Sequence, residues 1–179
     1  MRLGNPTIRV EDVLGEEELG HVQRLLGDFA AEFGPLVAEI FDVQGFAAEV
    51  AELPGRYAPP SGCLLLARDG DLAAGCVALR DLGDGTCEMQ RLYVASPYRG
   101  RGLGRHLIEG VVRRAERMGY RRMVLDTLPE MAGALAMYQA YGFVETAPYW
   151  GHPAEQAVFL ERSLEIVPAI GRSLDGEFD

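Results

Sequence analysis

The sequence contains no lysine: all 17 of its basic residues are arginine. A phosphate loop of the GxxxxGK[ST] type needs a lysine, so that class of nucleotide site is excluded. A pyridoxal Schiff base and any other lysine nucleophile are excluded for the same reason. Cysteines are few, and Cys63, Cys76 and Cys87 lack CxxC spacing. We expect them to be small buried residues in a reducing cytoplasm, and we predict neither a zinc site nor disulfides.

Long apolar runs are also missing. No segment approaches the roughly 20 apolar residues of a membrane helix, and residues 1–14 lack the apolar region of a signal peptide. We therefore expect a cytoplasmic protein without a membrane partner. The net charge of −10 argues against a nucleic acid partner, because phosphate contacts dominate that affinity. The length of 179 residues predicts one domain over residues 1–165, followed by a loose acidic tail at 166–179.

The spacing of apolar and turn residues predicts a mixed α/β chain. Strands are expected at 7–10, 63–68, 72–79, 86–94, 122–127, 143–150 and 157–164, and helices at 16–32, within 35–53, at 103–118 and at 131–141. The Gly34-Pro35 pair is expected to end the first helix. Asp-Gly turns join the second, third and fourth strands, which predicts an antiparallel meander. The predicted order is β-αα-βββ-α-β-α-ββ.

Glycines at positions 100, 102 and 104 lie between strand 86–94 and helix 103–118. They let the backbone approach a ligand closely, and the helix start adds free N–H groups and the positive end of its dipole. This arrangement is typical of a phosphate or pyrophosphate site. GxGxxG is not met, because Arg105 replaces its third glycine.

The charge around these glycines favours an anionic ligand over a plain strand-to-helix connection. Residues 91–122 contain nine arginines and two glutamates, so they carry +7 while the rest of the chain carries −17. Such a local reversal of sign concentrates an anion in one place. Arg99, Arg101 and Arg105 lie in or beside the glycine-rich turn. Three histidines, His21, His106 and His152, do not cluster in the sequence, so no metal site is predicted.

Two motifs resemble a known family. Arg99, Gly102 and Gly104 match [QR]xxGx[GA], which is similar to the coenzyme A pyrophosphate loop of the GNAT superfamily of N-acetyltransferases. Residues 134–143, ALAMYQAYGF, resemble the family's A-x-x-L-Y-x-x-x-G-F, one helix and one strand later. The resemblance covers roughly residues 62–164. It implies a GNAT-like domain in which helices flank a mixed, mostly antiparallel central sheet, with acetyl-CoA as cosubstrate and no metal.

The resemblance also implies the residues that bind the cofactor. In the family, the strand before the glycine loop splays from its neighbour, and the pantetheine arm pairs with it like an added strand. The cofactor-binding residues implied here are Leu92, Tyr93, Val94, Arg99, Gly100, Arg101, Gly102, Leu103, Gly104 and Arg105.

Two catalytic residues are implied as well. Tyr138 matches the tyrosine of the second motif and is the candidate acid that protonates the departing thiolate; the alternative is a core aromatic. Glu88 is the candidate base, because histone-type family members have a glutamate in a similar place. Its alternatives are an ion pair with Arg80 or Arg91, or a position on the sheet face open to water, and a water could relay the proton. Met131 departs from the family, since many members carry asparagine there.

These residues predict an N-acetyltransferase that moves an acetyl group from acetyl-CoA to a primary amine of a small molecule by direct attack. Two alternatives remain: a coenzyme A-binding sensor with little catalysis, and an acetyltransferase acting on protein or peptide amines. The negative charge outside the glycine-rich segment suits a cationic acceptor. Residues 149–152, Tyr-Trp-Gly-His, either line an acceptor pocket or pack on the core. Family members often form dimers, so the resemblance allows a homodimer as a partner state.

Overall fold

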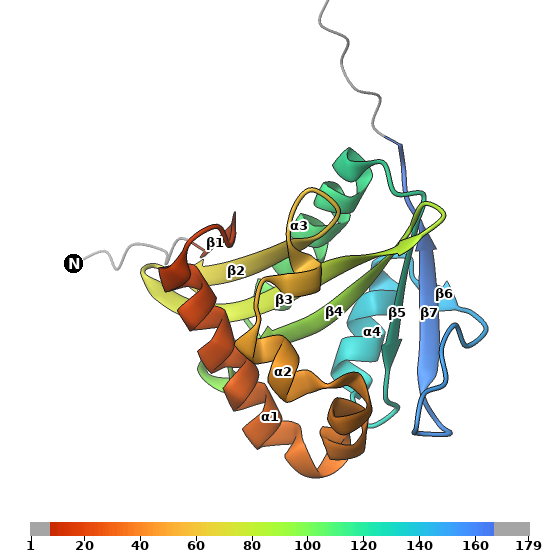
Figure 1. Cartoon of the computed structure of the whole chain (residues 1–179), viewed down its shortest axis with the longest axis horizontal. Coiled ribbons are helices and arrows are strands. Elements are labelled where there is room, and N and C mark those ends of the chain that lie inside the picture. Colours follow the sequence, from red (N-terminus) through yellow and green to blue (C-terminus); the bar gives the residue numbers. More distant parts are fainter. Residues whose placement is uncertain (1–7, 167–179) are drawn as a thin grey trace, which may run out of the picture.

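A seven-stranded sheet forms the centre of the computed structural model, which describes residues 8–166 (Figure 1). Its strands lie in the order β1-β2-β3-β4-β5-β7-β6. They are β1 (Ile8–Asp12), β2 (Cys63–Asp69), β3 (Leu72–Gly83), β4 (Thr86–Val94), β5 (Arg122–Thr127), β6 (Val144–Glu145) and β7 (Val158–Ser163). Among the described strands, β4 and β5 form the one parallel pair. The mixed, mostly antiparallel sheet and the order of elements predicted from the sequence are confirmed.

Helices cover both faces of this sheet. They are α1 (Glu16–Gln44), α2 (Phe46–Ala51), α3 (Leu103–Met118) and α4 (Ala132–Ala140), with short 3-10 turns η1 (Gly55–Tyr57) and η2 (Ser96–Tyr98). In β2, Leu65 packs with α3 and α4 residues, whereas its neighbours Leu64 and Leu66 pack with α1 and α2 residues. This alternation explains why β2 is apolar throughout: both of its faces are buried.

The first helix runs through Gly34-Pro35, so the predicted break there is wrong. Proline removes one hydrogen bond from a helix interior and costs about 3 kcal/mol. The apolar spacing continues beyond it, and the buried residues Val37 and Ile40 offset that cost. The ring of Phe41 also packs edge-on against that of Phe29, 5.4 Å away. Figure 1 shows the outcome: α1 changes direction sharply between its two halves, as helices do at proline.

The predicted strand 143–150 is also wrong over most of its length, because only Val144–Glu145 is strand. Pro148 has no N–H to give to a sheet ladder. The residues that follow leave the sheet, and the Tyr149 hydroxyl and Trp150 indole N–H bond instead to side chains of β4 and β5. The predicted tail at 166–179 lies outside the described residues, apart from Ile166.

The three cysteines are unpaired and buried, as expected. Burial raises the pKa of each thiol to about 12, so they remain protonated at neutral pH. None of the helices in residues 8–166 is long and apolar enough to cross a membrane.

Candidate active site

The sheet splits between β4 and β5. These strands pair only from Thr86–Arg122 to Glu88–Val124 and then separate. On its other side, β4 carries a bulge opposite β3, where Arg91 adopts a positive φ of 58°. A bulge bends a strand and increases its twist. The later part of β4 therefore presents backbone N–H and C=O groups that β5 does not use.

A cavity of about 640 Å3 fills this split. Its walls come from five parts of the fold that are distant in sequence: the second half of α1, the end of β4, the turn before α3, the end of β5 and the start of α4. Residues 150–153 close one side through His152. A cavity of this volume is typical of a site for a small molecule or cofactor.

The glycine loop, residues 99–105, forms one end of the cavity. Gly100 and Gly102 have φ angles of 73° and 82°, which side chains of L-residues rarely adopt. Gly102 is the N-cap of α3, so the N–H groups of the first turn point out of the helix end. Gly104 serves packing instead, because a Cβ there would lie 3.0 Å from Met137 of α4. The loop is therefore shaped to offer main-chain donors to an anion.

The three arginines of the loop are each paired with a carboxylate. Arg99 binds Glu32 of α1 through both terminal nitrogens, at 2.6 and 2.7 Å, and this lowers the pKa of Glu32. Arg101 binds Asp69 at 2.5 Å and is not among the cavity residues. Arg105 binds Glu109 at 3.1 Å. A phosphate would compete with these acids for the guanidinium groups, so backbone N–H groups are the loop's free donors.

The predicted strand residues Leu92, Tyr93 and Val94 all line the cavity. Leu92 and Val94 pack toward α3, whereas the buried Tyr93 side chain lies on the α1 side and stacks on Phe29 at 5.4 Å. The Tyr93 hydroxyl donates to Glu32, which also holds Arg99. Glu32 therefore ties α1 to both β4 and the glycine loop.

Tyr138 also lines the cavity, from α4. Its side chain is largely buried, and no described residue gives its hydroxyl a hydrogen-bond partner. Burial, and then the negative charge of Asp126, raise the pKa of this phenol above its usual value. Tyr138 therefore holds its proton at neutral pH, which suits a group that protonates a leaving thiolate.

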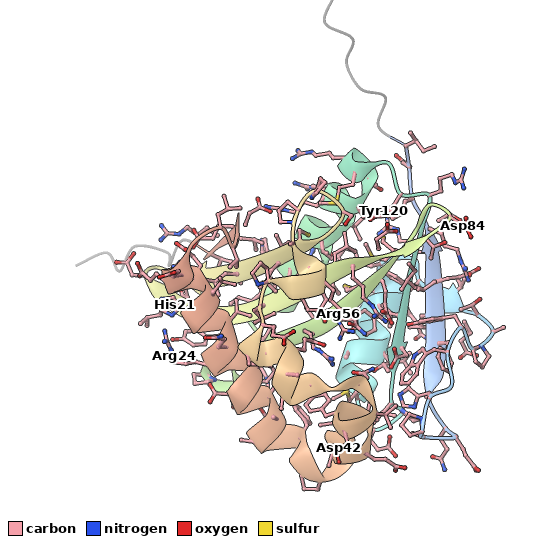
Figure 2. The ribbon with its side chains drawn as sticks, viewed as in Figure 1. His21, Arg24, Asp42, Arg56, Asp84 and Tyr120 are labelled. Atoms are coloured by element: carbon pink, nitrogen blue, oxygen red, sulfur yellow. The ribbon has the colours of Figure 1, made fainter. Side chains whose placement is uncertain are left out.

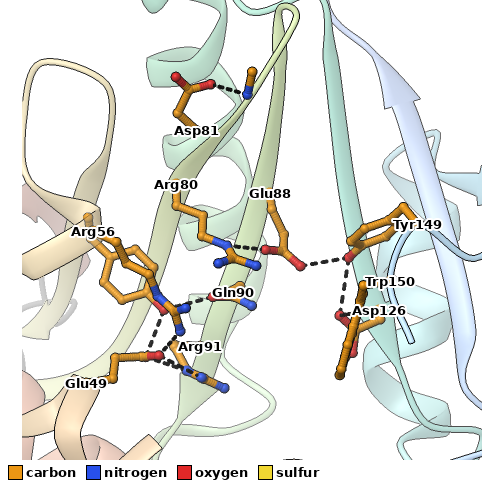
Figure 3. Close-up of polar contacts among 12 residues, drawn as sticks. Glu49, Arg56, Arg80, Asp81, Glu88, Gln90, Arg91, Asp126, Tyr149 and Trp150 are labelled. Atoms are coloured by element: carbon orange, nitrogen blue, oxygen red, sulfur yellow. Dashed lines mark hydrogen bonds and ion pairs between the residues drawn. The ribbon is translucent and has the colours of Figure 1, made fainter. Parts of the chain in front are cut away.

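Glu88 does not line the cavity. Its side chain is 0% exposed and forms an ion pair with Arg80 across the β3–β4 ladder (Figure 3). Its other oxygen accepts a hydrogen bond of 2.9 Å from the Tyr149 hydroxyl. Of the alternatives for this residue, the ion pair with Arg80 is present. Any ligand in the cavity reaches Glu88 only through an intervening group.

Asp126, which the sequence analysis missed, stands between Glu88 and the cavity. It lies near the end of β5, lines the cavity and is 14% exposed. Its Oδ1 is 3.2 Å from both the Tyr149 hydroxyl and the Trp150 indole nitrogen, and its Oδ2 is 3.3 Å from Nε2 of His152. The available signal was one acid after the buried run Met123–Leu125 in a central strand. Of residues 149–152, His152 lines the cavity, whereas Tyr149 packs edge-on against the buried Phe159, so each of the two predictions describes part of this segment.

Met131 and two of the histidines are the other residues singled out from the sequence. Met131 lines the cavity, and its sulfur lies 3.9 Å from the Thr127 hydroxyl. His21 lies on α1 beside Arg24, with its Nδ1 2.6 Å from the guanidinium (Figure 2). His106 turns back to the carbonyl of Gly102. Residues 8–166 contain no group of three or more histidine, cysteine or acidic side chains that could hold a metal.

A second polar cluster supports the bulge of β4 from below (Figure 3). Arg91 and Glu49 of α2 pair through two hydrogen bonds, at 2.7 and 2.9 Å, with side chains 6% and 7% exposed. Glu49 also pairs with Arg56 and accepts a hydrogen bond from Tyr57. The guanidinium of Arg91 lies over the Phe46 ring as well.

Glu49→Ala is expected to lower the free energy of unfolding by about 3–5 kcal/mol, because it leaves the Arg91 charge buried and unpaired. Urea denaturation measures the change. Asp71→Ala is the control, because the Asp71 side chain is fully exposed and its ion pair with Arg9, at 3.5 Å, lies in solvent. No measurable loss of stability is expected there. Equal losses in the two variants would contradict this account of the bulge.

Comparison with known proteins gives one consistent result. The model of the acetyltransferase (GNAT) family matches residues 29–143. An uncharacterized N-acetyltransferase of Schizosaccharomyces pombe is 36% identical over 86% of this chain and 93% of its own length. N-acetyltransferase 8F1 of Rattus norvegicus is 31% identical, but the match spans 55% of this chain and 47% of that protein.

Solved structures agree at the level of the fold. A GNAT-family acetyltransferase of Staphylococcus aureus superposes with a TM-score of 0.71 and 17% identity, covering 89% of this chain and 100% of that one. The PaiA N-acetyltransferase of Thermoplasma acidophilum, in complex with coenzyme A, gives 0.67 and 14%, covering 88% of this chain and 99% of that one.

Proposed function

Because this chain belongs to the GNAT family of acetyltransferases, we propose that it transfers an acetyl group from acetyl-CoA to a primary amine of a small molecule by direct attack. The family resemblance inferred from the two motifs is thereby confirmed, and the chain is an acyl-CoA N-acyltransferase. The proposal adds the acceptor, the residues that act and a cytoplasmic location, where the three thiols stay reduced.

The observation that carries the proposal is the continuity of the cavity. It connects the helix N-terminus at the glycine loop, the free backbone of β4 and the Tyr138 hydroxyl. Pyrophosphate at the loop would leave the pantetheine arm to pair with residues 92–94 and would bring the thioester near Tyr138. Backbone N–H groups of β4 that β5 does not use are candidates for stabilising the oxyanion. A carboxylate network, Glu88 and Asp126 joined by Tyr149, supplies the base.

An acceptor that enters as a cation fits the acidic side of the cavity. Asp126 and Glu130 are its carboxylates, and the guanidinium groups of Arg99 and Arg91, which also line the cavity, are paired with Glu32 and Glu49. The opposite wall is apolar, with Phe29, Phe33 and other residues of α1. An amine on an apolar or extended group therefore matches both walls. One relative, of Azospirillum brasilense, is named an IAA acetyltransferase; it is 30% identical over 60% of this chain and 71% of its own length.

A turnover screen tests the proposal. The protein is mixed with acetyl-CoA and one amine at a time, and release of the free thiol is followed. The panel contains phenethylamine, spermidine, glucosamine, a lysine-containing peptide and hydroxylamine. We expect turnover with at least one small amine and less with the peptide. Preference for the peptide would favour the protein acceptor. Tight coenzyme A binding without any thiol release would favour the sensor and contradict the proposal.

A further inference from the structure

A line of five side chains leads from β3 to the cavity: Arg80, Glu88, Tyr149 and Asp126, whose contacts Figure 3 shows, and then His152. The first two are an ion pair on β3 and β4, and the next contact is the Tyr149 hydroxyl, 2.9 Å from Glu88 and 3.2 Å from Asp126. Only the last two members, Asp126 and His152, line the cavity. A ligand therefore meets this line of groups at Asp126.

Tyr149 lies between two carboxylates but has one hydroxyl proton. Burial, Glu88 and Asp126 all raise its pKa, so the phenol stays protonated. It can donate to one carboxylate at a time, and the shorter distance is to Glu88. With both acids ionised and the proton donated to Glu88, the Tyr149 oxygen and Asp126 Oδ1 face each other without a proton between them. A proton or a cationic ligand at Asp126 removes that conflict.

His152 points to the same place. The backbone N–H of Ala154 donates to its Nδ1 at 3.0 Å, so the neutral ring carries its proton on Nε2. That Nε2 is buried, 3.3 Å from Asp126 Oδ2, and yet not aligned with it for a hydrogen bond. The side chain is 3% exposed and lines the cavity. A buried donor without a partner at a cavity wall indicates a place where a ligand completes the contacts. The Nδ1 lone pair of His152 is occupied by the Ala154 N–H, and the ring turns its N–H side toward Asp126, so the carboxylate is the proton acceptor on this wall.

We propose that Asp126 is the group that receives the proton of the incoming ammonium, through Oδ2, and that Glu88 acts on the reaction only through Tyr149. The Oδ1 of Asp126 accepts a hydrogen bond from the Trp150 indole N–H and lies 3.2 Å from the Tyr149 hydroxyl, whereas Oδ2 has only the misaligned His152 beside it. This inference rests on the proposed acetyl transfer. The ionisable groups that face Asp126 or reach it through the network are Tyr138, Tyr149, His152, Glu88 and Arg80.

The protons balance as follows. The ammonium gives its first proton to Asp126, and the neutral amine attacks the thioester carbonyl. As the C–N bond forms and the C–S bond breaks, nitrogen loses a second proton. The departing thiolate takes a proton from Tyr138, which regains one from the nitrogen. Asp126 then releases its proton to solvent, so the products are amide, free thiol and one proton.

Asp126→Asn tests the role directly, because the amide keeps an oxygen for Tyr149 and Trp150 but cannot accept the proton. With the fastest protonated amine of the panel, we expect kcat/KM at pH 7 to fall by about 10²–10⁴. The loss should shrink about tenfold per pH unit as the free amine becomes abundant. Hydroxylamine is already neutral at pH 7, so its rate should change by less than about threefold. Coenzyme A affinity should be unchanged.

Glu88→Gln and Tyr149→Phe separate a proton acceptor from its support. Each variant should lower kcat/KM about tenfold and shift the pH profile. The double variant should lose no more activity than either single variant, because both changes act through the same contact. Glu161→Gln is the control: this acid lies on β7, pairs with Arg122 and is not part of the cavity wall. We expect no kinetic effect there.

Each other outcome contradicts a different claim. If Glu88→Gln loses as much as Asp126→Asn while Tyr149→Phe loses nothing, Glu88 is the base and this inference fails. If Asp126→Asn loses as much kcat/KM with hydroxylamine as with a protonated amine, Asp126 has a structural role and the inference is overturned. Wild-type protein that acetylates hydroxylamine but no protonated amine overturns the role of Asp126 alone. No acetylation of any panel member overturns the proposed function itself.

Discussion

Replacing Gly102 with valine is expected to abolish coenzyme A binding. Gly102 has a φ of 82° and is the N-cap of α3, so a β-branched side chain would force the loop out of this conformation. Charge-assisted hydrogen bonds from backbone N–H groups contribute about 1.5–3 kcal/mol each. Loss of two corresponds to at least roughly 100-fold weaker binding. Calorimetric titration with coenzyme A measures the change.

Gly119→Val is the matched control. Gly119 caps the other end of α3, has a φ of 88°, and a Cβ there would meet nothing within 4 Å. A Cβ at Gly102 would meet only the His106 ring, at 3.8 Å. The two variants therefore carry similar local strain, but only one touches the cavity. Unchanged affinity in Gly102→Val, or equal losses in both variants, would show that the loop does not bind the pyrophosphate.

Tyr138→Phe is expected to lower kcat by about 10²–10⁴, the usual loss for a general acid, while coenzyme A affinity is kept. The change removes one hydroxyl from a residue that packs on Phe143 and has no hydrogen bond of its own to lose among the described residues. The folded state should therefore be as stable as before. Steady-state rates of thiol release and a thermal melt, measured on the same sample, test both statements.

Tyr120→Phe is the control for this second experiment. Tyr120 is buried to a similar degree, and its hydroxyl donates to the Ser61 carbonyl, far from the cavity. It should lose some stability and keep its turnover. If Tyr138→Phe turns over at the wild-type rate on every accepted amine, Tyr138 is a core aromatic and the thiolate leaves without its help.

Local sequence signals were sufficient for the elements that lie before and after the glycine loop. Strand 86–94, helix 103–118 and strand 122–127 have the predicted ends, because each is bounded by glycine or proline and has a clear apolar period. The two failures each combine a proline with contacts to residues elsewhere in the chain. The helix continues through Pro35 as Phe41 packs on Phe29, and after Glu145 the chain leaves the sheet at Pro148 and Tyr149 bonds to Glu88. A periodicity argument does not contain those contacts.

The site could be predicted only in part, because many of its contacts join residues that are far apart in the sequence. Glycines 100 and 102 were found because their role depends on their own backbone angles. The partners of the arginines were not, since Glu32 and Asp69 lie 67 and 32 residues from Arg99 and Arg101. Asp126 was missed because no motif near it in the sequence marks it as a site residue. Its contacts with Tyr149 and His152 form only after the chain has turned at Pro148.

The permanent cations in the ion pairs of residues 8–166 are all guanidinium groups, since the chain has no lysine. This has a chemical consequence for a protein that holds a reactive thioester. Arginine keeps its proton at any physiological pH, so it is not a nucleophile toward acetyl groups. The contacts of Arg99 with Glu32 and of Arg101 with Asp69, at the proposed pyrophosphate loop, therefore cannot be lost to acetylation of the cation. A protein with lysine at those positions would gradually modify the supports of its own binding loop.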